Sequence, residues 1–319
     1  MWNGSDVLLV LQGLNASRGQ RQVYFGLALS AYLLTILINL LLVLTVWLHR
    51  SLHKPIYIFL CNLCLNGMCG ASSFYPKLLR DLLAEAQVVT HGGCLAQLFG
   101  IYCYVFCEFT SLTVMAYDRY LAICRPLQYG SVMTVQKVLQ LLLLTWSFSL
   151  LETAVGTFLT ARLPLCRHRL PKIFCTNWEV VKLSCLGANT TVNSIYGLIL
   201  TISHLSQTTL ILVSYTHLVR ASMKLRSNRR KFMQTCVPHL LALLVFTISL
   251  LFDIMYSRYG GSSSSSTLAV LQNALAAEFL VVPPIINPII YGINLHQIRT
   301  KILQHLRPRE EPQKPPARS

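Results

Sequence analysis

Six ionisable side chains lie inside long apolar stretches of the chain, where a charge is costly: Glu108, Glu152, His204, His239, Asp253 and Glu278. A hydrolase could be assembled from such groups, but none of their spacings requires catalysis. No Cys/His spacing resembles a zinc site either. We therefore expect no enzymatic activity, metal or cofactor. An ionisable residue at membrane depth is instead a candidate for binding or switching.

Asp118, Arg119 and Tyr120 follow directly after a long apolar run. Arg119 is 25 residues after Cys94, or about 37 Å along a helix. That length reaches from one membrane interface to the other, so the Asp-Arg-Tyr triplet is expected at the inner edge. Glu108, about 16 Å back from Arg119, is then near mid-membrane. Asn66 is its expected neighbour, although a protonated Glu108 with only a hydrogen-bonding role remains an alternative.

These residues require membrane-spanning elements to position them. The 319 residues are 54% hydrophobic and only 12% charged, about half the charge of a soluble domain. We predict an all-α membrane protein, a bundle of seven transmembrane helices with a short inner amphipathic helix. The predicted spans are Val23–Leu48, Ile56–Leu79, Leu95–Cys124, Val135–Ala161, Val192–Val219, Cys236–Tyr256 and Leu268–Tyr291.

Three domains follow from these spans. Residues 1–22 form an extracellular N-terminus, 23–292 the seven-helix domain, and 293–319 a cytoplasmic helix and a disordered tail. Residues 1–22 have no signal-peptide pattern, so the first span is expected to direct insertion. Residues 260–267, GGSSSSST, are expected to be a flexible loop.

Two signals orient the bundle. Glycosylation acceptors at Asn3, Asn15 and Asn189 fall on the same side in a seven-span topology. The basic third inner connection (residues 220–231) favours the opposite side as cytoplasmic, although the basic residues of the 162–191 connection oppose it. The net charge of +16 is spread between apolar segments, so we expect a lipid bilayer rather than nucleic acid as partner.

The outer connection 162–191 is long enough to be ordered or functional. It contains Cys166, Cys175 and Cys185, and Cys94 begins the third span. Four cysteines in an oxidising compartment allow three pairings, and the spacing alone does not choose among them.

Several motifs occur in order along most of the chain: LHKPIYIFL (52–60), MAYDRYLAIC (115–124) with PLQY, Ser214-Tyr215, RKFMQTCVPHL (230–240) and PPIINPIIYG (283–292). Together they resemble an odorant receptor of the rhodopsin-like G-protein-coupled receptor family. The chain departs from the family pattern at Ile38, Asn66, Pro238 and Thr247. These departures put a sodium-type site at Glu108 and Asn66, and part of the switch in the sixth helix, in doubt.

The resemblance implies disulfides Cys94–Cys175 and Cys166–Cys185. It also implies that Arg119 pairs with Asp118 at rest and is released on activation. The residues implied in activation or G-protein coupling are Asp118, Arg119, Tyr120, Tyr215, His239, Asn287, Pro288 and Tyr291. An interfacial anchor is the alternative for each tyrosine.

A ligand pocket is expected among the outer halves of the helices, beneath the tethered loop. Its candidate residues are Ile101, Tyr102, Val105, Phe106, Leu200, Ser203, His204, Leu250, Leu251, Ile254, Ala277 and Leu280. Most are apolar, so burial would supply most of the affinity. Asp253 or Glu278 could favour an amine. Plain helix packing is the alternative for every one of these residues.

The predicted function is an odorant receptor that binds a small odorant and activates a stimulatory G protein, raising cAMP. Its expected location is the cell membrane of olfactory sensory neurons, with the N-terminus outside. The alternatives are a non-olfactory chemosensory receptor on the same scaffold and, less favoured, a transporter. A transporter would more often show repeated halves, which this sequence lacks.

Overall fold

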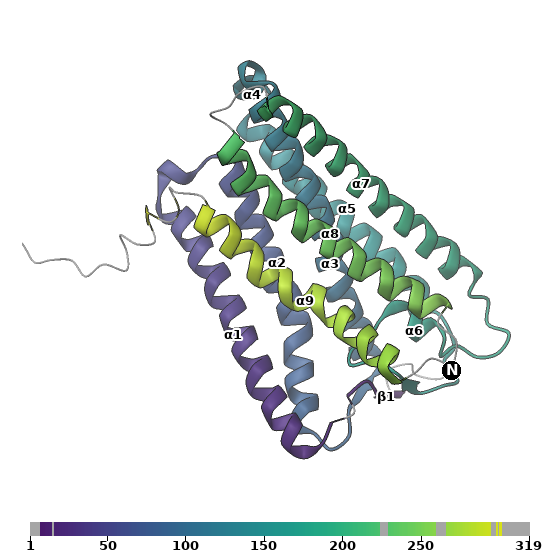
Figure 1. The fold of residues 1–319 in the computed structure, drawn as a ribbon. Coiled ribbons are helices and arrows are strands. Elements are labelled where there is room, and N and C mark those ends of the chain that lie inside the picture. The colour runs from purple at the N-terminus through teal and green to yellow at the C-terminus, as the bar shows by residue number, and fades with distance from the viewer. Residues whose placement is uncertain are drawn as a thin grey trace, which may run out of the picture.

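A computed structural model of the chain describes residues 7–14, 16–223, 229–259, 266–294, 298, 300 and 301. Within these residues the fold is a bundle of seven long helices with a small sheet at one end (Figure 1). The long helices are α1 Arg18–Leu48, α2 Pro55–Leu83, α3 His91–Cys124, α5 Val135–Ala161, α7 Thr191–Met223, α8 Arg229–Tyr259 and α9 Ser266–Asn294. The shorter elements are β1 Leu8–Leu11, β2 Val88–Thr90, β3 Arg169–Leu170, a 3-10 turn Arg50–Leu52, α4 Pro126–Val132 and α6 Asn177–Val181.

Local side chains fix where the helices begin. The Ser17 hydroxyl accepts from the Gln20 amide at 3.4 Å, and the Gln20 side chain accepts from the Ser17 amide at 2.9 Å. This capping box starts α1 five residues before the predicted span. Thr90 caps α3 and Thr134 caps α5 in the same way, each accepting from a backbone amide three residues on. The helices therefore extend beyond the apolar runs that predict them.

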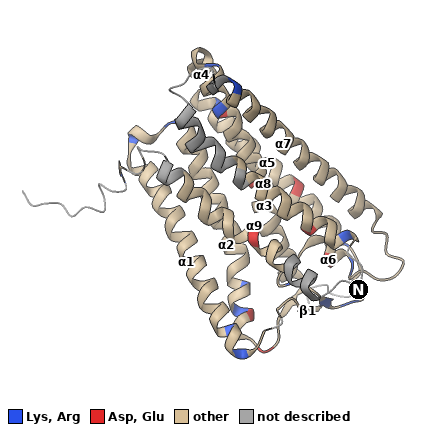
Figure 2. Ribbon diagram, in the orientation of Figure 1, with Lys and Arg blue, Asp and Glu red and all other residues tan. Residues whose placement is uncertain are grey.

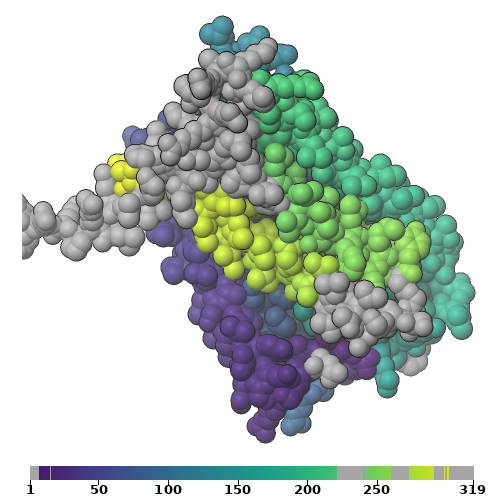
Figure 3. All heavy atoms as spheres, in the orientation of Figure 1, coloured from purple at the N-terminus to yellow at the C-terminus, as the bar shows by residue number. Residues whose placement is uncertain are grey.

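Helix α3 is the central element of the bundle. In its most apolar 18-residue window 72% of the residues are buried, against 17% in α1 and 11% in α7. Helices α1, α9 and α8 lie side by side on one face, coloured purple, yellow and light green (Figure 3). Because α3 is buried along its length, it can connect a site at one end of the bundle with a site at the other.

The exposed surface of the bundle is apolar, as a lipid-facing surface requires. Leu27, Leu37 and Leu143, for example, are each more than 60% exposed. Six helices have the length and hydropathy of a membrane span within the described residues: α1, α2, α3, α5, α7 and α9. Helix α8 does not meet the same hydropathy criterion there, but it packs between α7 and α9 as the seventh helix. The prediction of an all-α membrane bundle is confirmed.

Lys and Arg residues gather near the two ends of the bundle, whereas acidic residues are found both at these ends and between them (Figure 2). Helix α4 lies at one end, whereas β1 and α6 lie at the opposite end (Figure 1). The latter end contains the ordered 162–191 connection and is called the outer end below.

A three-stranded sheet covers the outer end, and the sequence analysis did not predict it. Strand β1 pairs antiparallel with β2 and parallel with β3, in the order β2-β1-β3. Leu9 and Leu11 are buried there against Cys94, Leu98 and neighbouring apolar residues. The N-terminal segment is therefore packed onto the long outer connection.

Two disulfides hold this connection in place. They join Cys94 to Cys175 and Cys166 to Cys185, the pairs expected from the resemblance. Asn189, a predicted glycosylation acceptor, is exposed just before α7. The other two acceptors, Asn3 and Asn15, lie outside the described residues.

Three further predictions fall wholly or largely outside the described residues. They are the flexible loop 260–267, the disordered tail and most of the inner amphipathic helix. The end of the predicted loop is wrong, because Ser266 and Thr267 begin α9. Of that helix, residues 298, 300 and 301 are described as helical, and Ile298 is fully buried in the main core.

Candidate functional site

A cavity lies in the outer half of the bundle between α3, α7, α8 and the long outer connection. It contains about 810 Å³ of space not filled by atoms, part of it open to solvent. Its wall is mainly apolar and aromatic, with a few polar groups, which is typical of sites for small molecules. The lining residues from α3 are Tyr102, Phe106 and Phe109, and the connection contributes Thr176, Asn177 and Trp178.

The cavity contains seven of the twelve predicted pocket residues. These are Tyr102, Phe106, Leu200, His204, Leu250, Leu251 and Ile254. Ile101, Val105 and Leu280 are instead buried in the main core, and Ala277 packs against that core. Helix α9 contributes no residue to the cavity among those described. Ser203, also not in the lining, hydrogen-bonds to the side chain of Glu152.

The outer wall of the cavity depends on residues of the outer connection that the sequence alone did not single out. The Asn177 carboxamide oxygen accepts from the Thr160 hydroxyl at 2.5 Å, and the Asn177 amide donates to the Tyr102 hydroxyl at 3.3 Å. The Arg258 guanidinium lies 4.3 Å from the centre of the Trp178 ring, a cation–π contact. These contacts attach the connection to α5, α3 and α8 around the cavity.

A buried ion pair makes a further attachment. The Lys172 ammonium, on the connection, lies 2.5 Å from Asp253 Oδ1 on α8. The Lys172 side chain is fully buried and that of Asp253 is 8% exposed, and Asp253 lines the cavity. The position of Asp253 in an apolar run signalled a functional role, but nothing in the sequence pointed to Lys172 as its partner.

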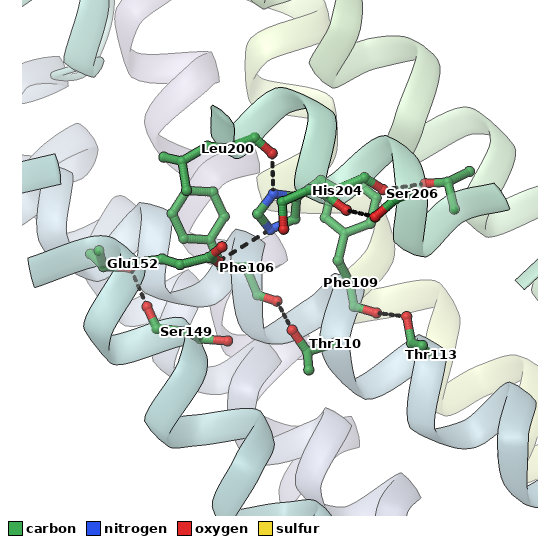
Figure 4. Close-up of polar contacts among 12 residues, drawn as sticks. Phe106, Phe109, Thr110, Thr113, Ser149, Glu152, Leu200, His204 and Ser206 are labelled. Carbon is green, nitrogen blue, oxygen red and sulfur yellow. Dashed lines mark hydrogen bonds and ion pairs between the residues drawn. The ribbon is translucent and has the colours of Figure 1, made fainter. Parts of the chain in front are cut away.

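His204 lies at the side of the cavity between two phenylalanines (Figure 4). Its ring centre is 4.6 Å from that of Phe106 and 5.1 Å from that of Phe109. Its Nδ1 is 2.8 Å from the Leu200 carbonyl oxygen, and its Nε2 is 3.6 Å from Glu152 Oε2. Both His204 and Glu152 are more than nine-tenths buried.

Glu108 lies near the middle of α3 and is buried by its neighbours. Its two oxygens accept from Asn66 at 2.9 Å and from Asn287 at 2.7 Å. The expected contact between Glu108 and Asn66 is therefore present, and α9 closes the site through Asn287. Among the described residues no three His, Cys, Asp or Glu side chains are grouped to hold a metal ion.

At the inner end, Asp118 is fully buried and bound to two neighbours. Arg119 donates to Asp118 Oδ2 through Nε at 2.9 Å and also through Nη2. The Tyr129 hydroxyl of α4 donates to Asp118 Oδ1 at 2.8 Å. Burial, followed by the negative charge of Asp118, raises the pKa of Tyr129 above its usual range. The phenol therefore stays protonated and keeps this hydrogen bond.

The remaining predicted inner residues are only partly described. Tyr215 is buried on α7, and Pro288 is buried within α9. The ring centres of Tyr120 and His217 are 6.2 Å apart. The side chains of His239 and Tyr291 lie outside the described residues.

Comparisons with known proteins show the family of the chain. The family described as "Olfactory receptor" matches residues 28–309. Rat "Olfactory receptor 1468" is 32% identical over 305 residues, 93% of both chains, and mouse "Olfactory receptor 4E2" is 35% identical over 280 residues, 87% of this chain and 88% of its own. Human "Olfactory receptor 52D1" is 32% identical over 90% of this chain and 91% of its own. Members of this family are multi-pass membrane receptors of the G-protein-coupled kind and are not enzymes. The chain belongs to the olfactory receptor family.

Proposed function

We propose that a small odorant binds in the cavity beneath the outer connection, and that binding activates a stimulatory G protein and raises cAMP. The observation that supports this most directly is the course of α3. The same helix lines the cavity with Phe106 and carries the Asp118–Arg119 pair at the inner end. The two positions are 13 residues, or about 20 Å, apart along one buried helix.

In this proposal the resting state is the one in which Asp118 holds Arg119. A ligand activates by favouring a second state in which Arg119 is released to the G protein. Tyr120, Tyr215, His239, Asn287, Pro288 and Tyr291 take part in that rearrangement. Glu108 and Asn66, joined by Asn287, form the candidate sodium-type site that accompanies it.

The proposed orientation places the N-terminus, with Asn3, Asn15 and Asn189 as glycosylation acceptors, outside the cell. The proposed location is the plasma membrane of olfactory sensory neurons. The inner end, with α4, then faces the G protein.

Screening odorants against cells that express the receptor tests the proposal. We expect at least one odorant to raise cAMP, and Arg119→Ala to abolish the rise with surface expression intact. Lys137→Ala, at the half-buried third position of α5, is a matched control that removes a basic residue at the same end. A response that survives Arg119→Ala, or solute flux without any cAMP change, would contradict the proposal.

A further inference from the structure

The structure also contains a smaller cavity next to the main one, and no function has been given to it above. It contains about 250 Å³ of space not filled by atoms, part of it open to solvent, between α3, α5 and α7. Tyr102, Phe106, Asn177 and Leu200 line both cavities, so the two are adjacent. Glu152 lines the smaller cavity and His204 the larger one. A ligand in the main cavity therefore has a side pocket within reach whose wall carries an acid.

Two polar atoms at this point, His204 Nε2 and Glu152 Oε2, lack a hydrogen-bond donor among the described residues, although Ser203 hydrogen-bonds to the Glu152 side chain. The Leu200 carbonyl can only accept, so His204 Nδ1 must donate to it. In the neutral imidazole Nε2 is then an acceptor, and it faces Glu152 Oε2 at 3.6 Å, beyond hydrogen-bonding distance. Within the described part of the chain neither atom has a hydrogen-bond partner. The dashed line between them in Figure 4 marks their 3.6 Å ion-pair contact.

Two further unpartnered acceptors lie on α7, outside the linings of both cavities. Asn193 Oδ1 and Gln207 Oε1, both on α7, are buried acceptors that no donor reaches within the described chain. A buried polar group without a hydrogen bond destabilises the site that contains it. At the side pocket itself, the unpartnered Glu152 Oε2 and His204 Nε2 favour a ligand group that donates two hydrogen bonds, and the unpartnered Thr157 hydroxyl in the wall of the smaller cavity can accept or donate another.

Charge points to the same kind of group. Among the described residues Glu152 has no Lys or Arg within ion-pair distance, and its only ionisable neighbour at that range is His204. Asp253, on the opposite wall, is already neutralised by Lys172. An ionised Glu152 at membrane depth therefore calls for a cation.

Among the described residues of the main cavity wall, Arg258 is the one Lys or Arg whose charge would repel a bound cation. Its distance from His204 limits this repulsion. A Cβ on Gly197 would lie 2.2 Å from the Arg258 guanidinium, so Arg258 packs against α7 at Gly197. His204 is seven residues further along α7, about 10 Å away. Coulomb energy falls with distance, so attraction by a carboxylate in contact is about three times stronger than repulsion across that gap.

We propose that the ammonium group of an amine ligand binds between Glu152 in the side pocket and His204 in the adjoining wall of the main cavity, and that its apolar part occupies the main cavity. This inference rests on the proposed ligand-binding role of that cavity. The ammonium donates to Glu152 Oε2 and His204 Nε2, and the face of Phe106 lies beside it. An alcohol has one donor for the two acceptors, and a carboxylate is repelled by Glu152.

The test uses purified full-length receptor and ligands matched in shape: 2-phenylethylamine with 2-phenylethanol and phenylacetate, and hexylamine with hexanol and hexanoate. Binding is measured as ligand-induced thermal stabilisation. We expect the amine of at least one set to bind more tightly than its alcohol and its acid. Glu152→Gln should weaken amine binding about tenfold or more, because it removes the charge but keeps the shape.

Two controls keep the result interpretable. Glu152→Asp retains the charge and should keep the preference for the amine over the alcohol. Glu179→Gln makes the same change at another buried carboxylate, which is paired with Lys182, and should leave amine binding unchanged. The inference is overturned if no amine binds more tightly than its counterparts, or if Glu152→Gln leaves amine affinity unaltered.

Failure here can be distinguished from failure of the proposed function. Amine binding that depends on Glu152 without any cAMP response contradicts the proposed G-protein coupling and leaves the amine site intact. A cAMP response to alcohols or acids that Glu152→Gln does not change supports the receptor function and rejects the amine site.

Discussion

The ion pair between Lys172 and Asp253 allows a quantitative prediction, because its two partners differ in their surroundings. Removing one member of a buried pair leaves the other charged and uncompensated, which destabilises a protein by about 3–5 kcal/mol. Asp253→Leu leaves the ammonium of Lys172, whose side chain has 0% exposure. Lys172→Met leaves Asp253, which lines a cavity that water can enter. We therefore expect Asp253→Leu to be the more destabilising change, near the upper end of that range.

The double variant Lys172→Met with Asp253→Leu removes both charges and should recover most of the lost stability. Lys182→Met is the matched control: Lys182 is 40% exposed and lies 2.9 Å from Glu179, and such a pair contributes about 1 kcal/mol or less. The assay is thermal unfolding of the purified receptor without ligand. The predicted order of stability is wild type and Lys182→Met, then the double variant, then Lys172→Met, then Asp253→Leu. A double variant no more stable than the worse single variant would refute the reasoning.

Three further predictions concern helix packing and the inner end. A Cβ at Gly70 would lie 2.4 Å from the Tyr104 ring, so Gly70→Ala should destabilise the receptor by about 1–3 kcal/mol. Gly26→Ala is the control, because a Cβ at Gly26 would have nothing within 4 Å, and it should not destabilise the receptor. Equal unfolding temperatures for the two variants would contradict this prediction. Tyr129→Phe removes a hydrogen bond to Asp118 and should raise ligand-independent cAMP, measured against surface expression. Folding raises the pKa of Tyr129 above 10.0, so the stabilising contribution of this residue is present below pH 10 and is lost as the pH rises further. Tyr129→Phe should reduce this loss of stability at alkaline pH. The measurement is the unfolding temperature as a function of pH.

The sequence predicts the helices well, because a membrane span must be long and apolar whatever it packs against. The ends were less accurate, since Ser17 and Thr90 cap helices that continue past the apolar core into the interface. The strand Leu8–Leu11 was missed because four apolar residues near a terminus carry no periodic signal, and its partners are far away in sequence.

The cavity was only half predictable for a similar reason. Spacing along α3 grouped Ile101 and Val105 with Tyr102 and Phe106, but adjacent positions are turned about 100° apart, and the rotation of the helix places the first two in the core. Trp178 lines the cavity, and Lys172 pairs with a cavity residue, only because the outer connection folds over the bundle. No local sequence pattern specifies the path of that connection. The importance of Glu152 likewise emerges only when α5 and α7 are placed side by side.

The central claim is that a ligand in the outer cavity controls the inner end of α3. The most direct measurement is the cAMP dose response to an active odorant in Leu200→Trp, which fills the cavity, and in Leu198→Trp, two residues away and 57% exposed on the surface of the bundle. At equal surface expression, we predict a loss of potency of about tenfold or more for Leu200→Trp and little change for Leu198→Trp. Equal potency in the two variants would contradict the claim.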